Sequence, residues 1–367
     1  MKRTMCRTMG VLLLCTWVAG TAAYAEDSTS SAPVTAQTVS AGTQAVTAGT
    51  QSVSVGAQSA PVGAQAVSVG TQAAFVGVQT GYLGGNTTYH ISQYSGGSGI
   101  ESELRFPLRT VLAGVQAGYK TELRNGKNEL QVSLSWMKNV TRGSGKVEDS
   151  DWATNDIDIS TVGTAHPGKD IYSESDMRLR ADLYDARAVL GFGIGERVKL
   201  GPMLGFKHQR FHYDVSNVNQ VGFGSYASSY TASVDGKVMT YDVVYDMVYV
   251  GVSADLKSSG TGSSFLTTAR FGFAPYVSVK DRDDHLLRSK MSTCNTTGVA
   301  ILASVGTNWK FSKGWLLGLN AEYLRISANG TQNQYFYGGS YAGTTYMIDD
   351  EITSSQVSLL ASLSYQF

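Results

Sequence analysis

Cysteine is scarce in this chain, and long apolar runs are almost absent. Of its three cysteines, Cys6 and Cys15 lie near the N-terminus and only Cys294 lies in the remainder. A single thiol forms no internal disulfide and, without partner cysteines, builds no thiolate zinc site, so we expect no metal. After the first 25 residues there is no apolar run of about 18 residues, which excludes helical membrane spans.

A charge surplus is also missing. The 29 Lys and Arg residues equal the 29 Asp and Glu residues, and the first 25 residues hold three of the basic ones, which leaves 26 against 29. Proteins that bind nucleic acid usually carry a basic surplus, so we expect no nucleic-acid partner.

The first 25 residues have the pattern of a secretory signal peptide. Three basic side chains, Lys2, Arg3 and Arg7, precede a short apolar stretch at 10–20, and Ala23-Tyr24-Ala25 forms a small-x-small cleavage site. The apolar stretch is too short for a membrane anchor, which needs roughly 20 residues. We therefore expect residues 1–25 to be removed after Ala25 on export.

Residues 26–71 contain a seven-residue repeat. Glycine recurs every seventh position from Gly42 to Gly84, and glutamine does so from Gln37 to Gln79. Glycine in each heptad costs a helix about 1 kcal/mol, and the leucine and charge pattern of a coiled coil is missing. Two interpretations remain, a flexible low-complexity linker or weak β-structure, and we favour the linker.

From residue 72 to 367, β-patterned segments alternate with turn signals. Short and long connections also alternate, as in a transmembrane barrel that has turns at one end and loops at the other. We predict an all-β, ten-stranded antiparallel transmembrane β-barrel with long extracellular loops at 141–169, 215–236, 281–295 and 328–351. The ten segments are 74–91, 100–123, 129–140, 170–193, 198–214, 237–256, 263–280, 296–311, 315–327 and 352–367.

The last two segments show two distinct faces. In 315–323, Trp315, Leu317, Leu319, Ala321 and Tyr323 alternate with a mainly polar set, so lipid would contact the first face and the barrel interior the second. In 357–367 an apolar face ends at the terminal Phe367, as in strands that barrel-assembly machinery recognises. Strands of 12 or more residues argue against a soluble β-sandwich, whose strands are about 5 or 6 residues long.

Two acidic groups stand where long loops are expected to begin. Asp149 and Asp151 follow the third segment, and Asp283 and His285 follow the seventh. Residues two apart in an extended chain point the same way, so each pair can face one cleft. A carboxylate beside an imidazole helps it to accept a proton from water, and two close carboxylates can share a proton.

These motifs, in this order, resemble the omptins, outer-membrane proteases of Gram-negative bacteria, over about residues 81–367. The matching blocks are Gly81-Tyr82-Leu83-Gly84-Gly85, Ser102-Glu103-Leu104-Arg105-Phe106, Asp149-x-Asp151-Trp152, His166-Pro167, Gly205 to Phe211, Met247 to Gly251, Asp281-x-Asp283-Asp284-His285 and the aromatic C-terminus.

The resemblance implies an endopeptidase that cuts near basic residues. Asp149 with Asp151, and Asp283 with His285, would be the catalytic couples, with a water between them attacking the peptide carbonyl. Asp281 matches an acid that holds the substrate arginine, whereas the strand-one glutamate of the family is replaced near Thr88-Tyr89, which makes Tyr89 a candidate substrate contact.

The resemblance also implies which cofactors and partners to expect. It needs no metal cofactor but requires lipopolysaccharide on basic outer-wall residues, of which Arg210 matches one, while another falls near Val244. The expected partners are outer-membrane lipid, lipopolysaccharide, a peptide substrate and the barrel-assembly machinery. We expect a site on the extracellular side. The alternatives are a barrel without proteolysis, acting as pore or adhesin, and a soluble secreted binding module.

Overall fold

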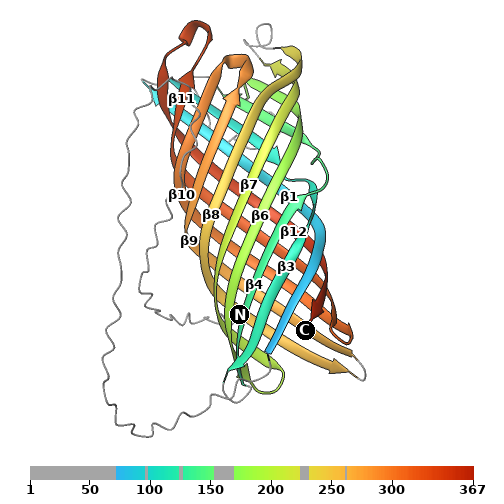
Figure 1. The fold of residues 1–367 in the computed structure, drawn as a ribbon. Coiled ribbons are helices and arrows are strands. Elements are labelled where there is room, and N and C mark those ends of the chain that lie inside the picture. Colours follow the sequence, from blue (N-terminus) through green and yellow to red (C-terminus); the bar gives the residue numbers. More distant parts are fainter. Residues whose placement is uncertain (1–71, 96–97, 124–126, 153–168, 224–230, 261–262) are drawn as a thin grey trace, which may run out of the picture. The chain divides into compact units, whose positions relative to one another are not determined.

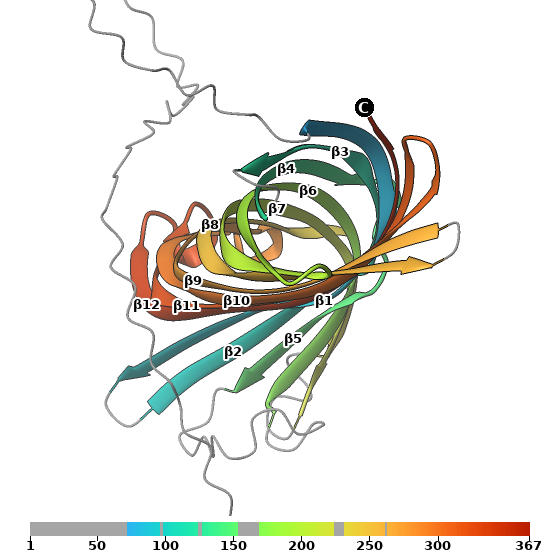
Figure 2. The same cartoon turned by 90° about the horizontal axis from the view of Figure 1, so that it is seen from below.

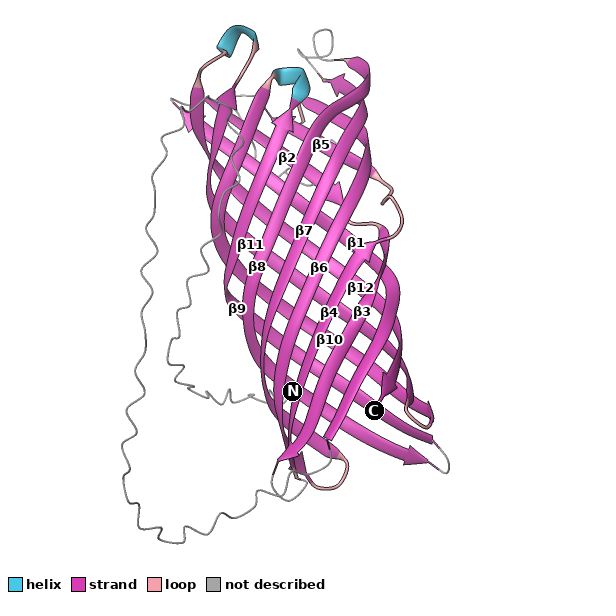
Figure 3. Ribbon diagram, in the orientation of Figure 1, coloured by secondary structure: helices cyan, strands magenta, loops and turns pink. Residues whose placement is uncertain are grey.

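The structure is a computed structural model that describes residues 72–95, 98–123, 127–152, 169–223, 231–260 and 263–367. The expected signal peptide, the repeat at 26–71 and His166-Pro167 lie outside these residues. The described chain is almost entirely strand (Figures 1 and 3). Its strands are β1 (Gln72–Ser95), β2 (Ser98–Pro107), β3 (Thr110–Leu123), β4 (Asn128–Asn139), β5 (Lys146–Trp152), β6 (Ile171–Ile194), β7 (Val198–Gly222), β8 (Ala232–Gly260), β9 (Ser263–His285), β10 (Lys290–Ser312), β11 (Trp315–Phe336) and β12 (Thr345–Gln366).

The strands form one closed antiparallel barrel. From β6 to β12 each strand pairs with the next along the chain, and β12 returns to pair with β1, so the sheet has no free edge along its length. Of the twelve described strands, β2 continues β3 along β1, and β5 continues β4 along β6. The ring therefore has ten positions, which confirms the predicted strand number; Figure 2 shows it from below.

The break between β3 and β2 coincides with a glycine in β1. Gly85 has a φ of +125°, and a Cβ atom there would lie 2.0 Å from the carbonyl oxygen of Ser355, so only glycine fits. The Leu108 amide donates to the Gly85 carbonyl oxygen at 2.9 Å, and the Ser144 amide donates to Arg109 at 3.1 Å. These bonds keep the barrel closed where two adjacent strands are interrupted.

An apolar belt surrounds the lower part of the barrel. Val357, Leu359 and Tyr365 on β12 are exposed, as are Trp315 and Leu319 on β11, which confirms the predicted faces of these strands. Because exposed side chains of this kind suit lipid rather than water, we assign this belt to the membrane. Among the described residues, no helix is long and apolar enough to cross a bilayer.

The strands continue well beyond the belt, and here the predicted loops were wrong. Residues 281–285 are the end of β9 and residues 290–295 the start of β10, with only the short 3-10 helix η3 (Leu286–Arg288) near the turn. Likewise β11 reaches Phe336 and β12 begins at Thr345, with η4 (Gly339–Tyr341) between them. We call this end, where β9 meets β10 and β11 meets β12, the rim.

The other two long loops were also overestimated. Only residues 223–231 separate β7 from β8, and the segment 141–169 contains β5. Charged and polar side chains in these stretches made them resemble loops, but a barrel interior accepts polar residues at every second position.

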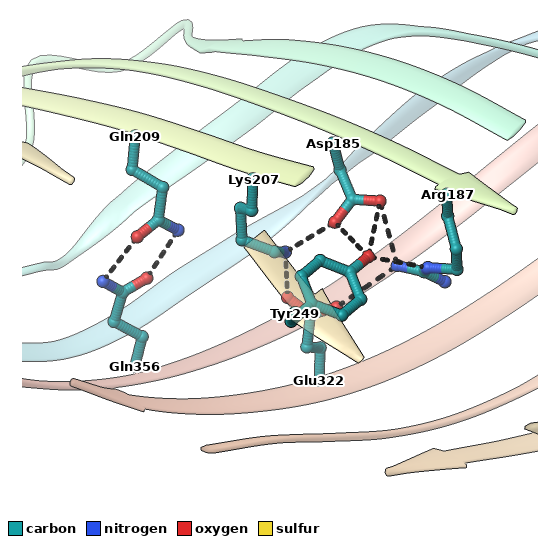
Figure 4. A network of polar contacts seen from close by, with 7 residues as sticks. All are labelled: Asp185, Arg187, Lys207, Gln209, Tyr249, Glu322 and Gln356. Carbon is teal, nitrogen blue, oxygen red and sulfur yellow. Dashed lines mark hydrogen bonds and ion pairs between the residues drawn. The ribbon is translucent and has the colours of Figure 1, made fainter. Parts of the chain in front are cut away.

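At belt level a network of paired charges crosses the interior (Figure 4). Lys207 Nζ lies 2.5 Å from Oε1 of Glu322 and 3.1 Å from Oδ2 of Asp185. Arg187 contacts Asp185 at 3.1 Å and donates to the Tyr249 hydroxyl at 3.0 Å. Above it, an aromatic layer crosses the interior: Phe106 stacks on Tyr241 with ring centroids 4.4 Å apart and contacts Tyr213 at 5.0 Å.

Candidate active site

The residues of the second predicted couple line one interior row at the end of β9. Asp281 and Asp283 are buried and His285 is nearly so, while Arg282 is exposed and Asp284 faces outward with it, as strand alternation requires. All lie beyond Tyr276, the last exposed apolar residue of the belt on β9, and so outside the membrane-spanning segment.

Asp283 and His285 are in direct contact. Nε2 of His285 lies 2.9 Å from Oδ2 of Asp283, whose side chain is 1% exposed. Neither carboxylate oxygen of Asp283 makes a hydrogen bond of standard geometry with the described residues. Burial lowers the pKa of His285 from its ordinary value, although Asp283 opposes that shift. A neutral imidazole at neutral pH is the form that can accept a proton.

The first predicted couple lies on β5, a strand rather than a loop. Asp149 is opposite Leu104 of β2 and Asp151 is opposite Ser102. The Ser102 hydroxyl donates to Oδ1 of Asp149 at 3.3 Å. Burial, together with the negative charge of Asp151, raises the pKa of Asp149 to about 8. At neutral pH this couple therefore retains a proton.

Two basic residues at the turn from β9 to β10 connect the couples. The Arg288 guanidinium is 3.9 Å from Oδ2 of Asp151 on β5. Lys290 is buried opposite His285, and its pKa is lowered by burial, while Asp283, Asp149 and Asp151 each raise it. Because one ammonium group interacts with acids of both couples, the couples face the same part of the rim.

Asp281 lies deeper, in a second acidic group. A carboxylate oxygen of Asp281, Sγ of Cys294 and a carboxylate oxygen of Asp350 all lie within 4.8 Å of one another. Burial, together with the charges of Asp350 and Asp283, raises the pKa of Asp281 to about 8, and burial raises the pKa of Asp350 to about 6. We call these three residues the acid pocket.

The remaining predicted residues lie on either side of the wall. Tyr89 is 1% exposed inside the barrel, where its hydroxyl accepts a hydrogen bond from the Gln332 amide below the acid pocket. Arg210 lies on the outer surface of β7 and contacts Asp242 at 3.3 Å. Tyr89 thus belongs to the floor of the site, and Arg210 is exposed where a ligand on the wall could contact it.

Sequence reasoning missed Lys290, Asp350 and the environment of Cys294. Asp350 was assigned to a loop, but it is an interior residue of β12 paired with Ile91 of β1. Cys294 is paired with Asp281 across β10 and β9. The only available sequence signal was the alternation of Ile348, Asp350 and Ile352, which continues the interior row of β12.

Comparison with known proteins agrees with this architecture. The model of the Omptin family matches residues 71–367. A plasminogen activator of Yersinia pestis is 22% identical over 254 residues, which are 65% of this chain and 73% of that protein. The crystal structure of the outer membrane protease OmpT from Escherichia coli superimposes with a TM-score of 0.67 at 15% identity, covering 83% of this chain and 99% of that one.

The fold and the family match together place the barrel in the bacterial outer membrane. Proteins of this family are proteases that act on peptide substrates. The chain belongs to the Omptin family.

Proposed function

We propose that this chain is an outer-membrane endopeptidase that hydrolyses peptide bonds near basic residues with a water activated by Asp283 and His285. The observation that carries the proposal is the convergence of two acid couples at one rim. Asp149 and Asp151 stand on β5, Asp283 and His285 on β9, and Arg288, three residues after His285, lies 3.9 Å from Oδ2 of Asp151. Clustered groups with opposed pKa shifts are typical of catalytic sites.

In the proposed reaction, Asp283 orients His285 and stabilises its protonated form. His285 takes a proton from the water, the hydroxide adds to the peptide carbonyl carbon, and the proton then passes to the leaving amine. Asp149 and Asp151 hold the water, and their retained proton can stabilise the negative charge that develops on the carbonyl oxygen. The chemistry uses no metal ion.

We assign the basic substrate side chain to Asp281, with Asp350 beside it. Both carboxylates are buried and close together, so a guanidinium or ammonium group between them would replace the protons that they otherwise share. Asp350 would thereby supply the second acid that β1 lacks near Tyr89.

The proposed orientation follows from the strand count. Ten strands bring the start of β1 and the end of β12 to the same side, so this side would face the periplasm and the rim the exterior. On the wall, Arg210 would bind lipopolysaccharide as an activating partner, and the exposed terminal Phe367 would be recognised by the barrel-assembly machinery.

An open pore is the weaker alternative. The charge network and the aromatic layer of the described chain both cross the interior, and Phe106, Tyr213 and Tyr241 are at most 1% exposed. These layers oppose conduction of solutes, and no feature of the described surface favours an adhesin.

The test compares neighbouring acids on β9. Asp283→Asn and His285→Ala should each lower cleavage of a basic peptide library by about 10²–10⁴-fold, the usual contribution of general-base catalysis. Asp284→Asn is the matched control, because this side chain faces outward and accepts a hydrogen bond from Tyr337. The assays use refolded protein with and without lipopolysaccharide, and heat-modifiable migration verifies folding. Equal activity in Asp283→Asn and Asp284→Asn would exclude the proposed site.

A further inference from the structure

The acid pocket has a composition that neither the fold nor a basic substrate requires, because its third member is a thiol. Asp281, Cys294 and Asp350 come from β9, β10 and β12 and are 6%, 5% and 4% exposed. The sequence argument against a metal site counted only partner cysteines. The barrel instead brings two carboxylates to the single thiol.

The carboxylates of the pocket are poorly satisfied by hydrogen bonds. None of the four oxygens of Asp281 and Asp350 makes a hydrogen bond of standard geometry with a described residue. Cys294 is held in place from the adjacent strand, since its Sγ donates to the carbonyl oxygen of Thr331 at 3.4 Å. Buried carboxylates without partners are costly, and a bound cation is the usual compensation.

The donor set selects a class of cation. One thiolate and two carboxylates give three protein ligands, which suits a four-coordinate ion that keeps one position open for water. Thiolate sulfur favours zinc and related transition metals, whereas calcium and magnesium take oxygen ligands alone. The mutual distances within 4.8 Å allow a single ion to reach all three residues with small side-chain movements.

We propose that Asp281, Cys294 and Asp350 form a site for one divalent transition-metal ion of the zinc type. Binding converts the Cys294 thiol to a thiolate and expels any proton held by the two carboxyl groups into solvent, with no change of oxidation state. Because binding releases these protons, the affinity for the metal falls in acid.

The site also has a consequence that rests on the proposed function. Asp281 is shared between the metal and the basic substrate side chain, and it lies two residues from Asp283 on the same interior row. The metal ion and the basic peptide therefore compete for Asp281. As a result, zinc raises the KM for basic peptides more than it lowers kcat.

The experiment titrates the folded full chain in detergent with cobalt(II), a spectroscopic substitute for zinc. The expected result is one cobalt per chain with a thiolate-to-cobalt charge-transfer absorption that zinc displaces. Cys294→Ser should abolish this absorption, and Asp350→Asn should weaken cobalt binding at least about tenfold. Asp246→Asn, an acid paired with His208 on the outer wall, is the matched control and should leave binding unchanged.

Absence of the thiolate absorption in the wild type overturns the proposal, as does its persistence in Cys294→Ser or unchanged affinity in Asp350→Asn. The wild-type result alone is decisive if a variant fails to fold, because the absorption requires a thiolate ligand. Asp283→Asn separates this proposal from the proposed protease mechanism, since that variant should lose proteolysis but still bind cobalt.

Discussion

Buried charges occur in two regions of this barrel, and they are balanced differently. At belt level, Lys207 and Arg187 neutralise Asp185 and Glu322 within 4.0 Å. At the rim, Asp281 and Asp350 are buried and have no basic partner at ion-pair distance among the described residues, and the ion-pair partner of Asp283 is His285. Removal of one partner from a buried ion pair destabilises a structure, whereas unpaired acids retained at a stability cost are typical of a site that binds or reacts.

The largest stability effect is expected in the belt network. Lys207→Met leaves Asp185 and Glu322 with Arg187 alone to balance two buried acids, and should lower the free energy of unfolding by about 3–5 kcal/mol. Urea unfolding in detergent, followed by tryptophan fluorescence, measures the change. Lys280→Met, on the exposed face of β9, is the control. If Lys207→Met loses less unfolding free energy than this control, the charge network does not stabilise the barrel.

At the rim, a substitution should weaken substrate binding without lowering stability. Asp350→Asn should raise KM for basic peptides about 10-fold to 100-fold, because a charge-assisted hydrogen bond contributes about 1.5–3 kcal/mol, and should leave the unfolding free energy unchanged or higher. Steady-state kinetics on paired peptides with arginine or glutamine at the cut site measure this. Glu351→Gln changes the exposed neighbour and serves as the control. If Asp350→Asn keeps the wild-type preference for arginine over glutamine, Asp350 does not bind the basic side chain of the substrate.

A smaller effect concerns pH. The pKa of Asp149 is about 8 in the folded chain and 3.8 ordinarily, so the folded chain binds its proton more tightly. Stability from this group is therefore present at low pH and is lost as pH rises from 3.8 through 8. Asp151 opposes ionisation of Asp149, whereas Arg288, Lys290 and the Ser102 hydroxyl favour it.

Asp149→Asn should reduce the loss of unfolding free energy between pH 5 and pH 8, which urea titrations at both values would measure. A steeper loss in the variant than in the wild type would mean that burial does not raise this pKa.

The smallest effect is expected on the outer wall. Arg210→Ala removes an exposed ion pair with Asp242 and should change the unfolding free energy by at most about 1 kcal/mol. If Arg210 binds lipopolysaccharide, the variant should nevertheless need a higher lipopolysaccharide concentration for half-maximal proteolysis. Superimposable lipopolysaccharide titrations would exclude that role.

Sequence alone predicted the strand number and faces because both follow from alternation with a period of two. It also paired Asp283 with His285 correctly, since residues two apart in a strand share a face. It missed the extension of β9 to His285, because Asp281 to His285 has the composition of a loop. The partners Asp350 and Cys294 depend on strand register and barrel closure, which no local pattern encodes.

The central claim is that both rim couples act on one water molecule, and a double-mutant cycle of Asp149→Asn and Asp283→Asn tests it directly. Residues that act as a unit are non-additive, so the double variant should cleave a basic peptide about as slowly as the slower single variant. Rate losses that multiply would show that the couples act independently and would contradict the shared-water account.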